Sequence, residues 1–190
     1  VISYLNAYRL VVSLGLLYAL FAGLVTTPQV LANTTVAGTT LVSYSIMAIF
    51  LAIEARRKTA RPYFLAKISL ITDVLFLSIL LFMFGGLESG VAILLIFTSA
   101  SAAILLPLRI ALRFASLIVL IFISESLTGM VFRNETPTEL VQAGLYGTTT
   151  LIITVLVNLL SHWRKHKKEE TLYSLLRSIN AIANAMGNTG

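Results

Sequence analysis

Two acidic side chains lie inside long apolar stretches of this 190-residue chain. Asp73 stands near the middle of the apolar run at 64–84, and Glu125 lies in the second half of the run at 114–132. A charged carboxylate in hydrocarbon is costly, so we expect both to face the interior of a helix bundle, protonated or hydrogen-bonded. Two roles are open for each of them. Each forms either a polar contact that a signal perturbs, or a hydrogen bond to Ser or Thr that only joins neighbouring helices.

The two histidines, His162 and His166, have a spacing that places them on one face of a helix, as metal ligands often are. Their neighbours are basic and would repel a cation, and the sequence offers no third ligand and no cysteine. We therefore predict no metal site and no cofactor. The sequence also contains no nucleophile–base pair and no glycine-rich phosphate loop, so we predict no catalytic residues and no enzyme activity in this chain.

A basic collar follows the apolar run at 140–160. Lys and Arg side chains next to a membrane span attract anionic lipid headgroups, and we expect this contact here. The residues concerned are Arg164, Lys165, Lys167 and Lys168.

An apolar stripe with heptad spacing continues beyond the collar. Spacings of three and four residues between apolar positions are typical of helices that pair in a coiled coil, so the stripe predicts a homodimer. The same stripe could instead lie on the membrane surface or against a following domain. Its residues are Leu172, Leu175, Ile179, Ile182 and Met186.

Composition indicates a membrane protein. Hydrophobic residues make up 57% of the chain, charged residues only 12%, and mean hydropathy is +0.91. A crossing needs roughly 20 apolar residues, so the chain has room for six spans and no sizeable aqueous domain. The fold class we predict is all-α: a polytopic bundle over 1–160, a collar and signalling helix over 161–186, and the start of a further region at 187–190. The expected spans are 10–25, 36–53, 64–84, 91–106, 114–132 and 140–160.

Basic residues set the expected orientation. All of the 14 Lys and Arg residues except Arg133 fall at one end of the predicted bundle, with Arg9 counted as a flank of the first span. Positive charge favours the cytoplasmic side, which places both termini in the cytoplasm. The net charge of +6 therefore reflects membrane orientation, and we expect no nucleic-acid partner. The connections on the other side are short, so a signal from outside must be small or must be sensed within the bilayer.

Small residues in the last span predict close helix packing. Ala143, Gly144 and Gly147 let helix backbones approach in lipid, either within one bundle or against a separate membrane helix.

Several short segments, in this order along the chain, resemble the membrane domain of PilS-type sensor histidine kinases. The stretch after Asp73 ends in FGGLESG at 84–90 and is followed by AAILL at 102–106 and by Arg109. YRLV at 8–11 and VQAG at 141–144 are similar to the same family, and the tail from 179 looks like the helix that leads into a PAS domain.

The resemblance implies a sensor of a two-component system in a bacterial inner membrane, with a cytoplasmic PAS-like region that starts at 187–190. Its parent would be a dimeric kinase that uses ATP and Mg in a region outside these 190 residues and passes phosphate to a response regulator. The implied signal is the transmembrane helix of pilin, and the implied output is pilus gene transcription. His162 and His166 lack the phosphoacceptor context and do not inherit that role. The alternatives are a small transporter or channel with an oligomerising C-terminal helix, and a structural membrane scaffold.

Overall fold

The computed structural model describes residues 2–22, 34–56, 62–133 and 138–187. These residues are almost entirely helical, and no strand occurs among them, so the predicted all-α class is confirmed. The elements in chain order are α1 (Ile2–Phe21), α3 (Thr34–Arg56), α4 (Pro62–Met83), the 3₁₀ turn η1 (Gly86–Ser89), α5 (Val91–Leu105), α6 (Leu108–Phe132) and α7 (Thr138–Gly187).

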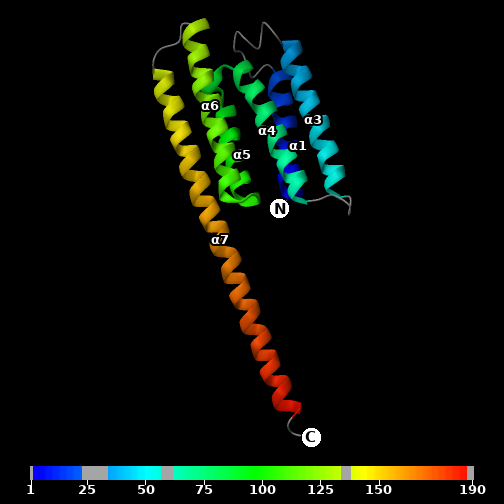
Figure 1. The fold of residues 1–190 in the computed structure, drawn as a ribbon. Coiled ribbons are helices and arrows are strands. Elements are labelled where there is room, and N and C mark those ends of the chain that lie inside the picture. The colour runs from blue at the N-terminus through cyan, green and yellow to red at the C-terminus, as the bar shows by residue number, and fades with distance from the viewer. Residues whose placement is uncertain (1, 23–33, 57–61, 134–137, 188–190) are drawn as a thin grey trace.

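The helices form one bundle, from which α7 projects far beyond the others (Figure 1). Helices α6 and α7 pack along each other with α5 against both, and α1 packs along α3. Helix α4 joins these groups because it contacts both α3 and α5. The core between them is apolar and includes Leu70 and Leu77 of α4, Leu95 of α5 and Phe122 of α6.

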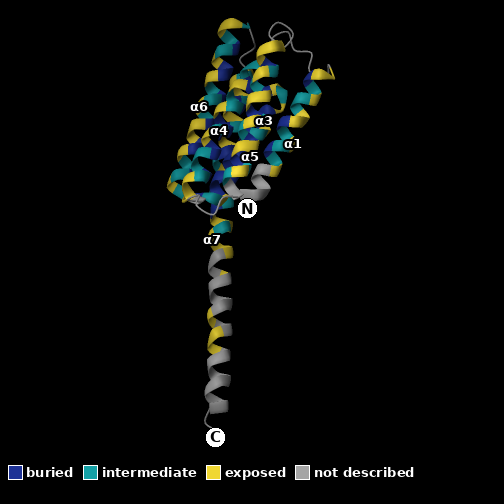
Figure 2. Cartoon of the chain, turned by 90° about the vertical axis from the view of Figure 1, so that its right-hand side faces the viewer, coloured by how far each residue is buried: buried dark blue, intermediate teal, exposed yellow. Residues whose placement is uncertain are grey.

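The outside of the bundle is as apolar as its core. Four helical segments, in α3, α4, α6 and the first part of α7, are long and apolar enough to cross a membrane, while α1 and α5 contain shorter apolar segments. Large hydrophobic side chains such as Phe50, Leu120 and Ile152 are exposed along these helices (Figure 2). A surface of this kind suits lipid rather than water, and the chain is a multi-pass membrane protein.

Two helices begin earlier than the apolar runs predicted. Helix α1 starts at Ile2 rather than near residue 10, and α6 starts at Leu108 rather than at residue 114. In α6, hydropathy marks only the part of the helix that suits hydrocarbon, and the helix itself begins earlier. In α1, the early residues include polar side chains such as Arg9 that are buried in the bundle, so hydropathy does not mark them as part of the span. Pro107 fits the N-terminal flank of α6, where its missing N–H costs no helical hydrogen bond.

The connection between α4 and α5 depends on glycine. Gly85, Gly86 and Gly90 have φ values of 94°, 74° and 74°, in the left-handed region that other residues rarely adopt. They allow the chain to end α4, form the turn η1 and start α5 within a few residues, so this end of the bundle is closed by a tight turn.

Candidate functional site

A buried ion pair joins α1 to α4. The Arg9 guanidinium donates hydrogen bonds from Nε to Asp73 Oδ1 at 2.6 Å and to Oδ2 at 2.8 Å, and from Nη2 to Oδ2 at 2.6 Å. Arg9 is 0% exposed and Asp73 is 2% exposed. A forked guanidinium–carboxylate contact of this kind fixes orientation as well as distance. The pair therefore sets how α1 lies against α4.

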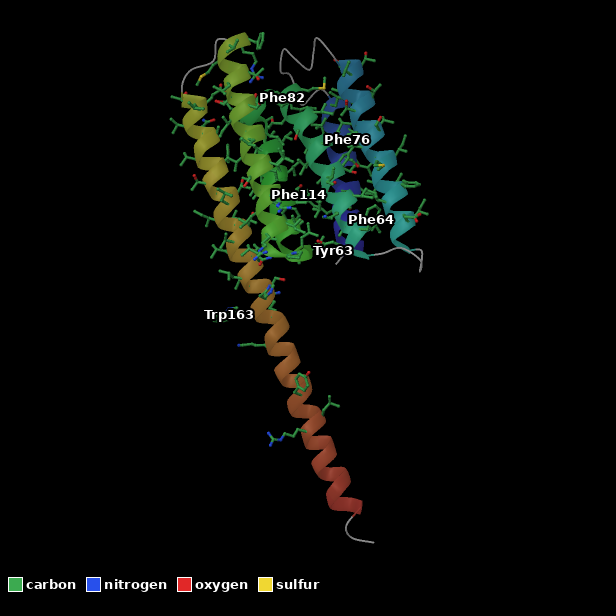
Figure 3. All side chains as sticks on the ribbon, viewed as in Figure 1. Tyr63, Phe64, Phe76, Phe82, Phe114 and Trp163 are labelled. Carbon is green, nitrogen blue, oxygen red and sulfur yellow. The ribbon has the colours of Figure 1, made fainter. Side chains whose placement is uncertain are left out.

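Tyr44 brings α3 into the same contact. Its hydroxyl donates to Asp73 Oδ1 at 3.0 Å, and its buried ring lies 5.3 Å from the ring of Phe76 on α4 (Figure 3). Arg9, Tyr44 and Asp73 are called the charge cluster below. Since its three members come from α1, α3 and α4, the cluster is the polar centre of this half of the bundle.

The residue before Arg9 on α1 connects this half of the bundle to α5. The ring of Tyr8 lies 4.4 Å from the ring of Phe97 on α5. Its hydroxyl is buried and has no hydrogen-bond partner within the part of the chain that the structure describes. A buried hydroxyl without a partner is costly, and this one is next to the charge cluster in the chain.

The sequence placed Asp73 correctly but not its partners. Asp73 lies inside the bundle, as its apolar run predicts, yet it is held by Arg9 and Tyr44 rather than by Ser or Thr. The expectation that Arg9 flanks the first span is wrong, because α1 begins at Ile2 and carries Arg9 into the bundle. The sequence did contain a clue to this pairing. A carboxylate inside a membrane bundle is stabilised by a basic partner, and Arg9 lies beside an apolar run.

The energetics of the charge cluster favour a positioning role. Removing two charges from water costs about as much as their mutual attraction returns, so a buried pair adds little net stability. Removing only one partner is different, because the other charge stays buried without compensation, at a cost of about 3–5 kcal/mol. The cluster therefore tolerates few relative positions of α1, α3 and α4.

Glu125 forms a second buried contact, near the end of the bundle that carries η1. Its side chain is fully buried, and Arg133, just after α6, donates a hydrogen bond from Nη2 to Oε1. The other carboxylate oxygen, Oε2, has no hydrogen-bond partner among the described residues. A Cβ atom at Gly86 would lie only 2.7 Å from Glu125 Cδ, so the carboxylate sits against the backbone of η1. The turn η1 and the end of α6 are thereby held together.

Polar side chains of α7 form hydrogen bonds with α5. The Thr154 hydroxyl lies 2.6 Å from that of Ser99, and Asn158 Nδ2 donates to the carbonyls of Ala103 at 2.8 Å and Leu106 at 3.2 Å. The last carbonyls of a helix lack partners within it, so the Asn158 amide caps the end of α5. Sequence reasoning missed Asn158, although an amide inside an apolar run needs such partners for the same reason as a carboxylate.

The predicted packing residues separate into two groups. Ala143 is buried, and Gly147 faces Val119 of α6, where a Cβ would lie 3.1 Å from Cγ1. Gly144 lies on the exposed face of α7 with nothing near its Cβ position. Ala143 and Gly147 thus pack within the bundle, whereas Gly144 is open to the membrane.

The collar and the heptad stripe lie on α7 beyond the bundle. Of the expected headgroup contacts, Arg164 and Lys167 are exposed, and the side chains of Lys165 and Lys168 lie outside what the structure describes. Side chains of the whole predicted heptad stripe, Leu172, Leu175, Ile179, Ile182 and Met186, also fall outside the described part, so pairing through it stays a prediction. No cluster of three His, Asp or Glu side chains suited to a metal occurs among the described residues.

A family model, the PilS-like transmembrane domain, matches residues 1–171. The chain belongs to this family. The match covers every helix of the bundle, so the charge cluster, the Glu125 contact and the α5–α7 contacts all lie within a PilS-like membrane sensor domain. Comparisons with curated proteins and with solved structures gave no match.

Proposed function

We propose that this PilS-like domain is the input part of a dimeric sensor histidine kinase, which senses pilin within the bacterial inner membrane and controls pilus gene transcription through a response regulator. The observation that carries the proposal is the family match over 1–171. The parent kinase would supply the ATP and Mg chemistry and the phosphoacceptor histidine, while this chain supplies the signal.

The orientation proposed for the domain places both termini in the cytoplasm. Arg133 lies at the end of the bundle opposite to that from which α7 emerges, and the collar lies at the end from which α7 emerges. The positive-inside tendency supports this orientation even without Arg9, whose charge is paired inside the bundle. Helix α7 then carries the signal from the membrane into the cytoplasm.

A shallow hollow along the outward face of α6 supports a membrane helix as the signal. It lies on this one helix, where apolar residues such as Leu120 and Leu127 lie beside Ser124 and Thr128. Small polar residues on a lipid-facing helix favour contact with another helix, because they allow close approach and hydrogen bonding. The pilin transmembrane helix is the occupant we propose.

The mechanism we propose runs from α6 through α5 to α7. A helix that binds against α6 displaces the pair α5–α6 slightly, and the α7 side chains Thr154 and Asn158 follow because they are bonded to α5. The charge cluster holds α1, α3 and α4 as a fixed reference against which α5 moves. Transport is less well supported, because Asp73 and Glu125 are packed among buried side chains and the two carboxylates lie in separate contacts.

Reconstitution of the full-length protein tests this function. We expect phosphate transfer from ATP to the protein in proteoliposomes, and a changed level of labelling when purified pilin is reconstituted with it. Asn158→Leu should abolish the response to pilin while leaving basal labelling, because the cap between α7 and α5 is lost. Absence of labelling would refute the kinase assignment, and labelling that ignores pilin would refute pilin as the signal.

A further inference from the structure

A cavity of about 750 Å³ lies where α7 leaves the bundle. One wall is the start of α6, with Leu108 and Arg109. The other is α7, with His162, Trp163 and Lys167. Figure 3 places Trp163 on α7 just beyond the end of the bundle. The cavity therefore sits at the level where an apolar span gives way to the basic collar, which is the level of lipid headgroups.

The lining of this cavity is suited to an anionic amphiphile. Arg109 and Lys167 bring positive charge from two different helices, and His162 adds a further hydrogen-bonding group. The described residues that line the cavity include no carboxylate. The N-terminus of α6 also begins here, and its first N–H groups favour negative charge. Leu108 and Leu159 form an apolar part that suits an acyl chain. Basic pockets between membrane helices are known to hold anionic headgroups.

We infer that this cavity binds the phosphate headgroup of an anionic phospholipid, which bridges Arg109 of α6 and Lys167 of α7. The site differs from the general attraction of the collar, because Arg164 is exposed on the same helix and does not line the cavity. The lipid site does not depend on what the domain senses, so it can be tested independently of the proposed function.

The position of the site gives it a mechanical consequence. Asn158, which caps the end of α5, lies in the wall of the same cavity. A phosphate held by both Arg109 and Lys167 fastens α7 to the α5–α6 connection at the point where α7 leaves the bundle. Lipid occupancy therefore strengthens the same joint that the Asn158 amide makes.

Trp163 offers a direct measurement, because it is the single tryptophan of the chain. The protein is reconstituted in phosphatidylcholine vesicles that contain either brominated phosphatidylglycerol or brominated phosphatidylcholine at equal fractions. Bromine quenches tryptophan only at short range, so excess quenching by the anionic lipid reports its enrichment at the cavity. We expect a clear excess, and a loss of about five-fold in the relative association constant for each of Arg109→Gln and Lys167→Gln.

Matched controls separate the site from surface electrostatics. Arg113→Gln and Arg164→Gln remove the same charge from exposed positions outside the cavity, and both should retain the excess quenching. Equal quenching by the two lipids, or an equal loss in the control variants, would overturn the inference. Inorganic phosphate should not displace the anionic lipid. Full displacement by inorganic phosphate would make the ligand a free phosphate and would also overturn the lipid assignment.

Discussion

Replacing Asp73 alone should destabilise the bundle more than replacing Arg9 and Asp73 together. In Asp73→Leu the Arg9 guanidinium loses all three of its hydrogen bonds to the carboxylate and remains buried. In the double variant Arg9→Leu/Asp73→Leu no charge is left behind, and both side chains suit an apolar core. Asp73→Asn keeps the shape of the side chain but removes the counter-charge of Arg9, so we expect it to destabilise the bundle as Asp73→Leu does.

The magnitudes follow from burial. Breaking one side of a buried pair costs about 3–5 kcal/mol, whereas replacing both partners by apolar residues is often close to neutral. Tyr44→Phe removes one hydrogen bond to a charged group, which costs about 1.5–3 kcal/mol. The expected order of stability is therefore wild type and the double variant highest, Tyr44→Phe below them, and the single Asp73 variants lowest.

Unfolding by dodecyl sulfate in mixed micelles, followed by circular dichroism, measures this order. Glu88→Leu is the control, because it removes an exposed carboxylate from η1. If the double variant loses as much stability as Arg9→Leu and Asp73→Leu added together, the two charges act independently and the positioning role of the cluster is wrong.

Three further predictions concern the turn η1 and the α7 extension. Gly86→Ala should lower the stability by more than the roughly 1–2 kcal/mol that a left-handed residue costs, because its Cβ meets Glu125. Gly90→Ala is the control, because Gly90 has the same φ but open space around its Cβ position. Equal melting temperatures for the two variants would contradict the contact with Glu125. One alanine inserted between Glu170 and Thr171 turns the following helix by about 100° and should lock output, whereas seven should restore the response; a steady decline without recovery would indicate a flexible tether. Cysteines at positions 172, 175 and 179 should crosslink between copies more than those at 173, 177 and 180, and equal yields would argue against the heptad stripe as the dimer contact.

Apolar runs were sufficient to predict the six α-helices in the part of the chain that the structure describes, because length and hydropathy together favour a membrane-crossing helix. They could not predict which helices touch. In α4 the neighbours Leu70 and Ile71 are both apolar, yet the first is 0% exposed and the second 53% exposed. In a soluble bundle the exposed position would be polar and would mark the outer face. In lipid both faces are apolar, so the pattern loses this information.

For the two intramembrane carboxylates, burial could be predicted from the sequence, but the partner of each side chain could not. The burial of Asp73 follows from cost alone, since any intramembrane carboxylate must avoid lipid. Its pairing with Arg9 depends on α1 lying beside α4, which no local pattern specifies. The positive-inside tendency counted Arg9 as a surface charge, because it considers distance along the chain and not burial. Asn158 was missed because an uncharged amide stands out little in an apolar run.

The unbroken course of α7 from Thr138 to Gly187 has a consequence for how two copies can meet. Positions 158 and 172 are two heptads apart, so in a straight helix they differ by only about 40° in azimuth. The face that contacts its own bundle through Asn158 thus continues into the predicted heptad stripe, while Ile152 and Leu156 are exposed on the other side. If two parallel copies pair along that stripe, each copy places its bundle on the side of α7 where the partner helix runs. The two α7 helices would then have to cross where they enter the membrane, so that the bundles do not overlap. A change in this crossing angle would change the distance between the C-terminal ends of the two helices.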